Sequence, residues 1–140
     1  MSFFPVYMDA SAIVKLVKAE PESDALISSL ARWPDRVTVA LARVEVHRAL
    51  WRMGGSRTEH TRADAVLDGL VLIRVDDAIL TRAASFKDRD LRALDAIHLA
   101  TALTLGDDPE VFVTYDARLA RAAERVRLPV AHPGVERLEA

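Results

Sequence analysis

Short runs of β-branched and aromatic residues alternate along this chain with longer stretches whose apolar residues recur every three or four positions. The first pattern favours strands and the second favours amphipathic helices. Strands are predicted at residues 6–8, 37–40, 70–75, 111–115 and 128–131. Helices are predicted at residues 10–18, 21–33, 41–53, 56–68 and 91–105, from residue 76 or 77 onward, and from 116 to about 126.

Strands that alternate with helices favour an α/β sandwich around a short, mostly parallel central sheet. No repeat, low-complexity segment or Gly/Ser/Pro-rich linker divides the 140 residues, so we expect one domain over residues 1–140. In such sheets ligands gather at the carboxyl ends of the strands. This rule directs attention to Asp9 and Asp116, because each stands where a predicted strand gives way to a helix.

The composition narrows the functional classes. With 51% hydrophobic and 29% charged residues, the chain is typical of a globular protein, and no apolar run approaches the roughly 20 residues of a membrane span. The first residues have no basic segment followed by an apolar one, so we expect no secretion. Cysteine is absent, which excludes disulfides, thiolate zinc sites and a cysteine nucleophile and favours the cytoplasm. The net charge of −2 gives no general support to nucleic-acid binding.

Two acidic residues follow predicted strands. Asp9 separates VYM from ASAIVKL, and Asp116 repeats this arrangement in VFVTYDARLARAA. An Asp at such a position can cap the helix by accepting a backbone N–H bond, worth about 1 kcal/mol. It can also be a ligand or a catalytic group. If the two strands are neighbours in a parallel sheet, both carboxylates lie at one edge.

Two more acidic residues lie in predicted helices. Asp95 has Leu91 and Leu99 at i−4 and i+4, so we place it inside a helix on an apolar stripe. A carboxylate there needs an arginine, a proton or a cation. Glu45 stands in LARVEVHRALWRM, where it can pair with Arg48 at i+3 or face a site.

Four segments carry a resemblance to a known family: YMDASAIVKL, RVEVHRAL, LRALDAIHLATAL and FVTYDARLARAA. Their order and spacing resemble the motif series of PIN-domain nucleases, and in particular the VapC-type toxins of bacterial toxin–antitoxin pairs. The resemblance runs from Val6 to about Ala123. It implies a PIN-domain-like three-layer sandwich and a ribonuclease.

The resemblance also implies roles for individual residues. The acidic positions of the family fall on Asp9, Glu45, Asp95 and Asp116. Its small hydroxyl residues fall on Ser11 and Thr114. Two interpretations stay open for them: they orient the carboxylates as hydrogen-bond donors, or they are ordinary hydroxyls at a helix start and in a strand. The family often has an aromatic residue or Asn near the last motif, where this chain has Ala117 and Leu119, which bears on local packing.

Converging carboxylates repel one another unless a cation lies among them, and oxygen ligands without cysteine favour Mg²⁺ or Mn²⁺. We expect Asp9 and Asp95 to hold the principal ion, with Asp116 and Glu45 completing the site or recruiting a second ion. The ion would acidify a water that attacks the scissile phosphorus. His47 and His98 are left outside the site as helix residues that pack their rings.

The resemblance further implies an RNA substrate, an antitoxin that covers the acidic site, often with an Arg or another basic side chain, and a homodimer. An alternative is an inert PIN-like module that acts only by binding protein partners. A phosphatase of the haloacid dehalogenase type is disfavoured, because it expects a second Asp where Ser11 stands. The target RNA is not apparent from the residues.

Overall fold

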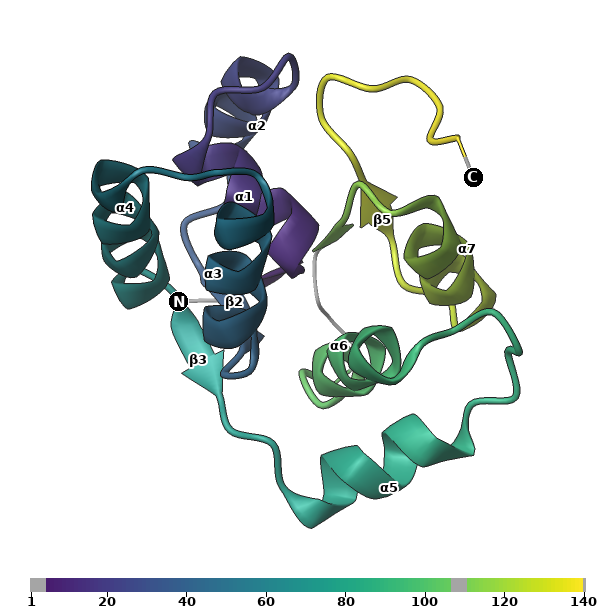
Figure 1. The fold of residues 1–140 in the computed structure, drawn as a ribbon. Helices are drawn as coiled ribbons and strands as arrows, with labels where there is room; N and C mark the ends of the chain where they lie inside the picture. Colours follow the sequence, from purple (N-terminus) through teal and green to yellow (C-terminus); the bar gives the residue numbers. More distant parts are fainter. Residues whose placement is uncertain (1–4, 107–110, 140) are drawn as a thin grey trace.

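The computed structural model describes residues 5–106 and 111–139, and its centre is a five-stranded sheet (Figure 1). The strands are β1 (Val6–Met8), β2 (Arg36–Val39), β3 (Val71–Ile73), β4 (Val111–Val113) and β5 (Val130–Ala131). Their order is β3-β2-β1-β4-β5, and each of the four pairings is parallel. The predicted short parallel sheet is therefore confirmed.

Helices cover both faces of this sheet (Figure 1). They are α1 (Ala10–Val17), α2 (Ser23–Leu30), α3 (Ala42–Arg52), α4 (Arg57–Asp68), α5 (Asp77–Ser85), α6 (Ala93–Leu103) and α7 (Ala117–Arg125). Each corresponds to a predicted helix. Of the helices in the described residues, none has the length and apolarity needed to cross a bilayer.

The side chains of β1 show why the fold has three layers. Val6 and Met8 are buried in a cluster with residues of α1, α3 and α4. Tyr7 lies between them in sequence and is buried on the other face, with residues of α6 and α7. Strands covered on both sides need apolar residues at successive positions, which explains the unbroken apolar run of β1.

Two helices begin later than predicted. The predicted second helix includes Pro21, but α2 begins at Ser23, after a turn. The helix predicted from Leu91 begins at Ala93, because Arg92 has an extended backbone with ψ of 162°. Asp95 therefore lies in the first turn of α6 and not in its interior, so its position is one that the helix dipole favours for an acidic residue.

The topology brings two predicted site residues to the same place. β1 pairs with β2 on one side and with β4 on the other, so the chain changes direction across the sheet at the β1–β4 boundary. Asp9 follows β1 and Asp116 follows β4 at the same edge, and the backbone N–H of Asp9 donates to the carbonyl of Val113 at 3.2 Å. Such switch points are where α/β sheets bind ligands.

Candidate active site

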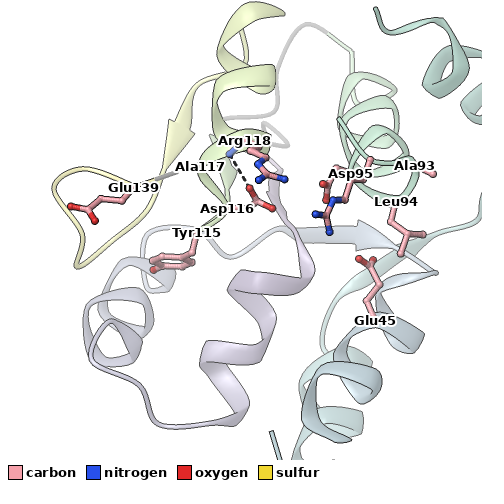
Figure 2. Close-up of a pocket in the computed structure, with 10 residues that line it drawn as sticks. Glu45, Ala93, Leu94, Asp95, Tyr115, Asp116, Ala117, Arg118 and Glu139 are labelled. Carbon is pink, nitrogen blue, oxygen red and sulfur yellow. Dashed lines mark hydrogen bonds between the residues drawn. The ribbon is translucent and has the colours of Figure 1, made fainter. Parts of the chain in front are cut away.

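A cavity of about 420 Å³ opens at the carboxyl edge of β1 and β4, and the four predicted carboxylates line it with Ser11 and His98. A neighbouring hollow of about 630 Å³ shares three of these residues, Glu45, Asp95 and Asp116. We call the two together the acidic cavity. Figure 2 shows these three side chains reaching the same open space from α3, α6 and the start of α7.

Asp9 is the most enclosed of the four carboxylates, with 3% of its surface exposed. Its Oδ1 accepts the Ala12 backbone N–H at 3.0 Å and the Ser11 hydroxyl at 2.6 Å. Its Oδ2 accepts the Thr114 hydroxyl at 2.5 Å. Burial raises the pKa of Asp9, although the charge of His98 and these hydrogen bonds act in the opposite direction. Asp9 is thus both a helix cap and a rigidly held carboxylate in the cavity.

Asp116 combines the same two features at α7. Its Oδ1 accepts the backbone N–H groups of Arg118 at 2.9 Å and Leu119 at 3.3 Å, the first of which is drawn in Figure 2. Its own N–H donates to the Thr114 hydroxyl at 3.1 Å. Thr114 therefore bridges Asp9 and Asp116. Asp9 and Asp116 thus each cap a helix and also line the cavity, and their role as ligands stays a prediction.

Ser11 connects the same two loops from the other side. Its hydroxyl donates to Asp9 and accepts the backbone N–H of Tyr115 at 2.9 Å. Ser11 and Thr114 thus make the contacts with the Asp9 carboxylate that an orienting role requires. Their contribution to catalysis stays a prediction.

Glu45 lies in the first turn of α3, and its carboxylate contacts a histidine that is buried in the core. Its Oε1 is 2.7 Å from Nε2 of His98, whose Nδ1 is 2.7 Å from the Tyr7 hydroxyl. The ion pair with Arg48 that the helical spacing permits is not found among the described residues. Burial alone lowers the pKa of His98, but the hydrogen bond and charge of Glu45, with Asp9 and Asp95, outweigh it, and the pKa of His98 is raised.

His98, which we left outside the predicted site, lies at the edge of the acidic cavity. Its ring is packed in the core, as expected of a helical histidine, but it also lines the cavity and contacts Glu45. The available signal was its position three residues after Asp95, one turn along the same helix. His47, by contrast, joins α3 to α4, with its Nδ1 2.7 Å from Nδ1 of His60 and its Nε2 2.7 Å from Oδ1 of Asp64.

The pKa of Asp95 shows that negative charge accumulates in the cavity. Partial burial, and then the negative charges of Asp116, Asp9 and Glu45, raise its pKa to about 6, against the opposing effect of His98. Accumulated negative charge of this kind favours a proton or a cation at the site.

Four exposed arginines surround these carboxylates. The larger hollow is lined by Arg92 and Arg118, and the smaller by Arg48 and Arg52. In the described part of the chain none of the four forms an ion pair. Their guanidinium groups are therefore available for an anionic ligand, and the planar, five-donor group suits phosphate.

The donor set suits a hard divalent cation with water among its ligands. Within residues 5–106 and 111–139, no three His, Asp or Glu side chains stand close enough together to enclose a metal ion directly. Mg²⁺ normally keeps several waters and takes one or two carboxylates directly. Carboxylates placed around a cavity of this size fit that mode of binding, in which some of them act through water.

Comparison with known proteins identifies the family and supports the fold. The PIN-domain family model matches residues 6–125, and the chain belongs to this family. Among its relatives are VapC ribonucleases of Mycobacterium tuberculosis. Ribonuclease VapC46 is 49% identical over 129 residues, covering 91% of this chain and 97% of the relative. Ribonuclease VapC35 is 41% identical over 139 residues, covering 94% and 99%.

Two solved structures share the fold at low identity. The Mycobacterium tuberculosis VapC20 structure, a toxin that cleaves the sarcin–ricin loop, has a TM-score of 0.69 at 18% identity and covers 84% of this chain and 94% of its own. A toxin–antitoxin complex from Klebsiella pneumoniae has a TM-score of 0.62 at 20% identity, with 81% and 88% covered. The predicted PIN-like three-layer sandwich is confirmed.

Proposed function

We propose that this chain is a VapC-type endoribonuclease, the toxin of a toxin–antitoxin pair, and that it hydrolyses RNA phosphodiester bonds with Mg²⁺ or Mn²⁺. The observation that carries the proposal is that four carboxylates from separate parts of the chain line one cavity. The chain is also 49% identical to a named ribonuclease over nearly its whole length.

The proposed roles of the carboxylates follow from how each one is held. Asp9 and Asp95 are the principal ligands of the cation, while Glu45 and Asp116 complete the site directly or through water. Ser11 and Thr114 keep the Asp9 carboxylate in one orientation through their hydrogen bonds. A bound divalent cation would supply Lewis-acid chemistry, by acidifying water and neutralising charge on the phosphate.

The arginines around the cavity offset the repulsion between its carboxylates and an RNA substrate. RNA is a polyanion, and a cavity lined by four carboxylates repels it. Arg92 and Arg118 on one side, with Arg48 and Arg52 on the other, place positive charge around the cavity. We propose that they bind phosphates on either side of the scissile bond, which would orient the strand without reading its bases.

Further proposals concern the assembly. A cognate antitoxin would cover the acidic cavity with a basic side chain, and the exposed apolar residues Val44 and Leu94 at its rim suit such a contact.

We also propose a homodimer. A single PIN-like domain over residues 1–140 would extend the family match at 6–125. RNA cleavage would take place in the cytoplasm.

The first test is the substitution Asp9→Asn. It removes the charge, keeps one oxygen for the hydrogen bonds from Ser11 and Ala12, and places an amide that can donate to the Thr114 hydroxyl. The fold should therefore persist while cleavage of single-stranded RNA falls by at least about 100-fold. Single-turnover cleavage assays measure the rate, and thermal unfolding checks the fold.

The matched control is Asp68→Asn, which removes an exposed carboxylate at the end of α4. This variant should cleave at the wild-type rate. Wild-type cleavage by Asp9→Asn would exclude the proposed ligand set. Absence of cleavage by the wild-type chain, with partner binding retained, would instead favour the inert binding module.

A further inference from the structure

A chain of hydrogen bonds runs from the core of the protein to the acidic cavity. The Tyr7 hydroxyl lies 2.7 Å from Nδ1 of His98, and Nε2 of His98 lies 2.7 Å from Oε1 of Glu45. These residues come from β1, α6 and α3. The contacts thus link the sheet, one covering helix and one wall of the cavity.

The inner part of this chain is enclosed. Tyr7 is 0% exposed and His98 is 1% exposed. Their rings pack edge to face with centroids 5.7 Å apart, and Tyr7 stacks on Phe112 on its other side. An imidazole packed in this way, with both nitrogens hydrogen-bonded, has one available orientation.

The chemistry of the partners determines the direction of the bonds. An ionised Glu45 can only accept, so Nε2 of His98 carries a proton and donates it. When His98 is neutral and carries its proton on Nε2, Nδ1 is an acceptor and the Tyr7 hydroxyl is its donor. Burial raises the pKa of Tyr7 well above its ordinary value, and the phenol therefore keeps its proton.

Glu45 needs such support more than Asp9 and Asp116 do. Asp9 and Asp116 are short side chains fixed by backbone N–H groups, whereas a glutamate has three rotatable bonds and its carboxylate borders solvent. Leaving it free would require its ordering each time a ligand binds. The bond from His98 holds Oε1 and leaves Oε2 available to the cavity.

We propose that His98 is a positioning residue that holds Glu45 in the acidic cavity, and that Tyr7 positions His98 in turn by fixing its tautomer. The inference rests on the proposed function, since it assigns a role within the same site. It differs from a purely structural role, in which His98 would fill space in the core and Glu45 would find its place independently.

The test compares three variants by Mn²⁺ binding in the absence of RNA, measured from the electron paramagnetic resonance signal of free Mn²⁺. His98→Leu fills the space without a donor and should weaken binding by about tenfold. His98→Gln retains an N–H donor near the Nε2 position and should restore most of the lost affinity. Tyr7→Phe keeps the ring stacking and should cause a smaller loss than His98→Leu.

Nitrogen NMR of the histidine ring provides a second readout that needs neither metal nor RNA. The proton of His98 should lie on Nε2, and Glu45→Gln should shift the His98 ring signals. A neutral ring with its proton on Nδ1 alone, or ring signals unchanged in Glu45→Gln, would overturn the proposal. So would a folded His98→Leu variant that binds Mn²⁺ as tightly as the wild type.

The two readouts also separate this inference from the proposed function. If His98→Leu does not fold, Tyr7→Phe and the NMR measurement decide the matter. If the wild-type chain neither binds Mn²⁺ nor cleaves RNA, the proposed function fails, whereas the ring signals still report whether His98 holds Glu45.

Discussion

At the scale of single residues, the raised pKa of Asp95 shows that the crowded carboxylates destabilise the metal-free protein. Its pKa of about 6 lies above the ordinary value of 3.8, because of partial burial and the three neighbouring carboxylates. Below pH 3.8 the residue is protonated in both folded and unfolded chains and has no net effect. As the pH rises toward 6 the unfolded chain ionises first, so the metal-free protein loses stability across this window.

We therefore predict that Asp95→Asn stabilises the metal-free protein at neutral pH. Because the side chain is partly exposed, solvent screening reduces the gain, which we expect to be about 1 kcal/mol, or about 2–4 °C in Tm. The difference between variant and wild type should vanish about one pH unit below 3.8 and approach its full size above pH 6. Thermal unfolding in chelator across this range measures it, and a difference that does not change with pH would contradict the account.

Single residues also differ in how well their place in the site could be predicted from the sequence. Asp9 and Asp116 could be located because a strand that ends in Asp before a helix is a local pattern. His98 was harder to place, because the local signal is only its spacing from Asp95, while its partners Tyr7 and Glu45 are 91 and 53 residues away. For the same reason the Arg48 partner suggested for Glu45 was wrong: helical spacing describes neighbours on one helix and not those that tertiary packing supplies.

At the scale of elements, α3 and the starts of α6 and α7 each bring arginines to the cavity beside a carboxylate. Arg48 and Arg52 are one turn apart on α3, while Arg92 precedes α6 and Arg118 lies in the first turn of α7. Each pair can reach a different part of an RNA strand that crosses the carboxylates.

We predict that removing either arginine pair weakens RNA binding without abolishing it. In an Asp9→Asn background, which prevents cleavage, both double variants, Arg92→Ala/Arg118→Ala and Arg48→Ala/Arg52→Ala, should lower affinity for a labelled single-stranded RNA. The salt dependence of log K should become shallower by about 1.4 for two lost phosphate contacts.

The control for this measurement is a pair of exposed arginines on other helices, Arg57 on α4 and Arg82 on α5. Their replacement by Ala should leave both the affinity and the salt slope close to those of the parent. If the control pair and the cavity pairs behave alike, binding is diffuse and the proposed contacts are wrong.

Element boundaries were harder to predict than the elements themselves. Hydrophobic periodicity predicted all seven helices found in the described residues. It placed the start of α6 at Leu91, two residues too early, because the apolar side chain of Leu91 continues the pattern. In the structure the N–H of Leu91 instead closes a turn by donating to the carbonyl of Asp88 at 3.2 Å. The apolar pattern reports burial, which continues through this turn, and not the backbone conformation.

At the scale of the whole molecule, the site exists because parallel strands distant in sequence are neighbours. Thr114 and Asp9 are 105 residues apart and share a hydrogen bond of 2.5 Å, which follows from the β1–β4 pairing. The sequence predicts a parallel sheet but not its strand order. The order β3-β2-β1-β4-β5 comes from the structure, and the similarity of fold at 18–20% identity indicates that the arrangement tolerates extensive sequence change.

We propose above all that the carboxylates of the acidic cavity bind a divalent cation with which the protein hydrolyses RNA. The most direct measurement is single-turnover cleavage of a labelled RNA by the wild-type protein, purified away from any antitoxin, first in chelator and then after Mg²⁺ or Mn²⁺ is restored in excess. The account predicts no cleavage in chelator and full recovery with either ion. Cleavage that persists at an unchanged rate in chelator would contradict it.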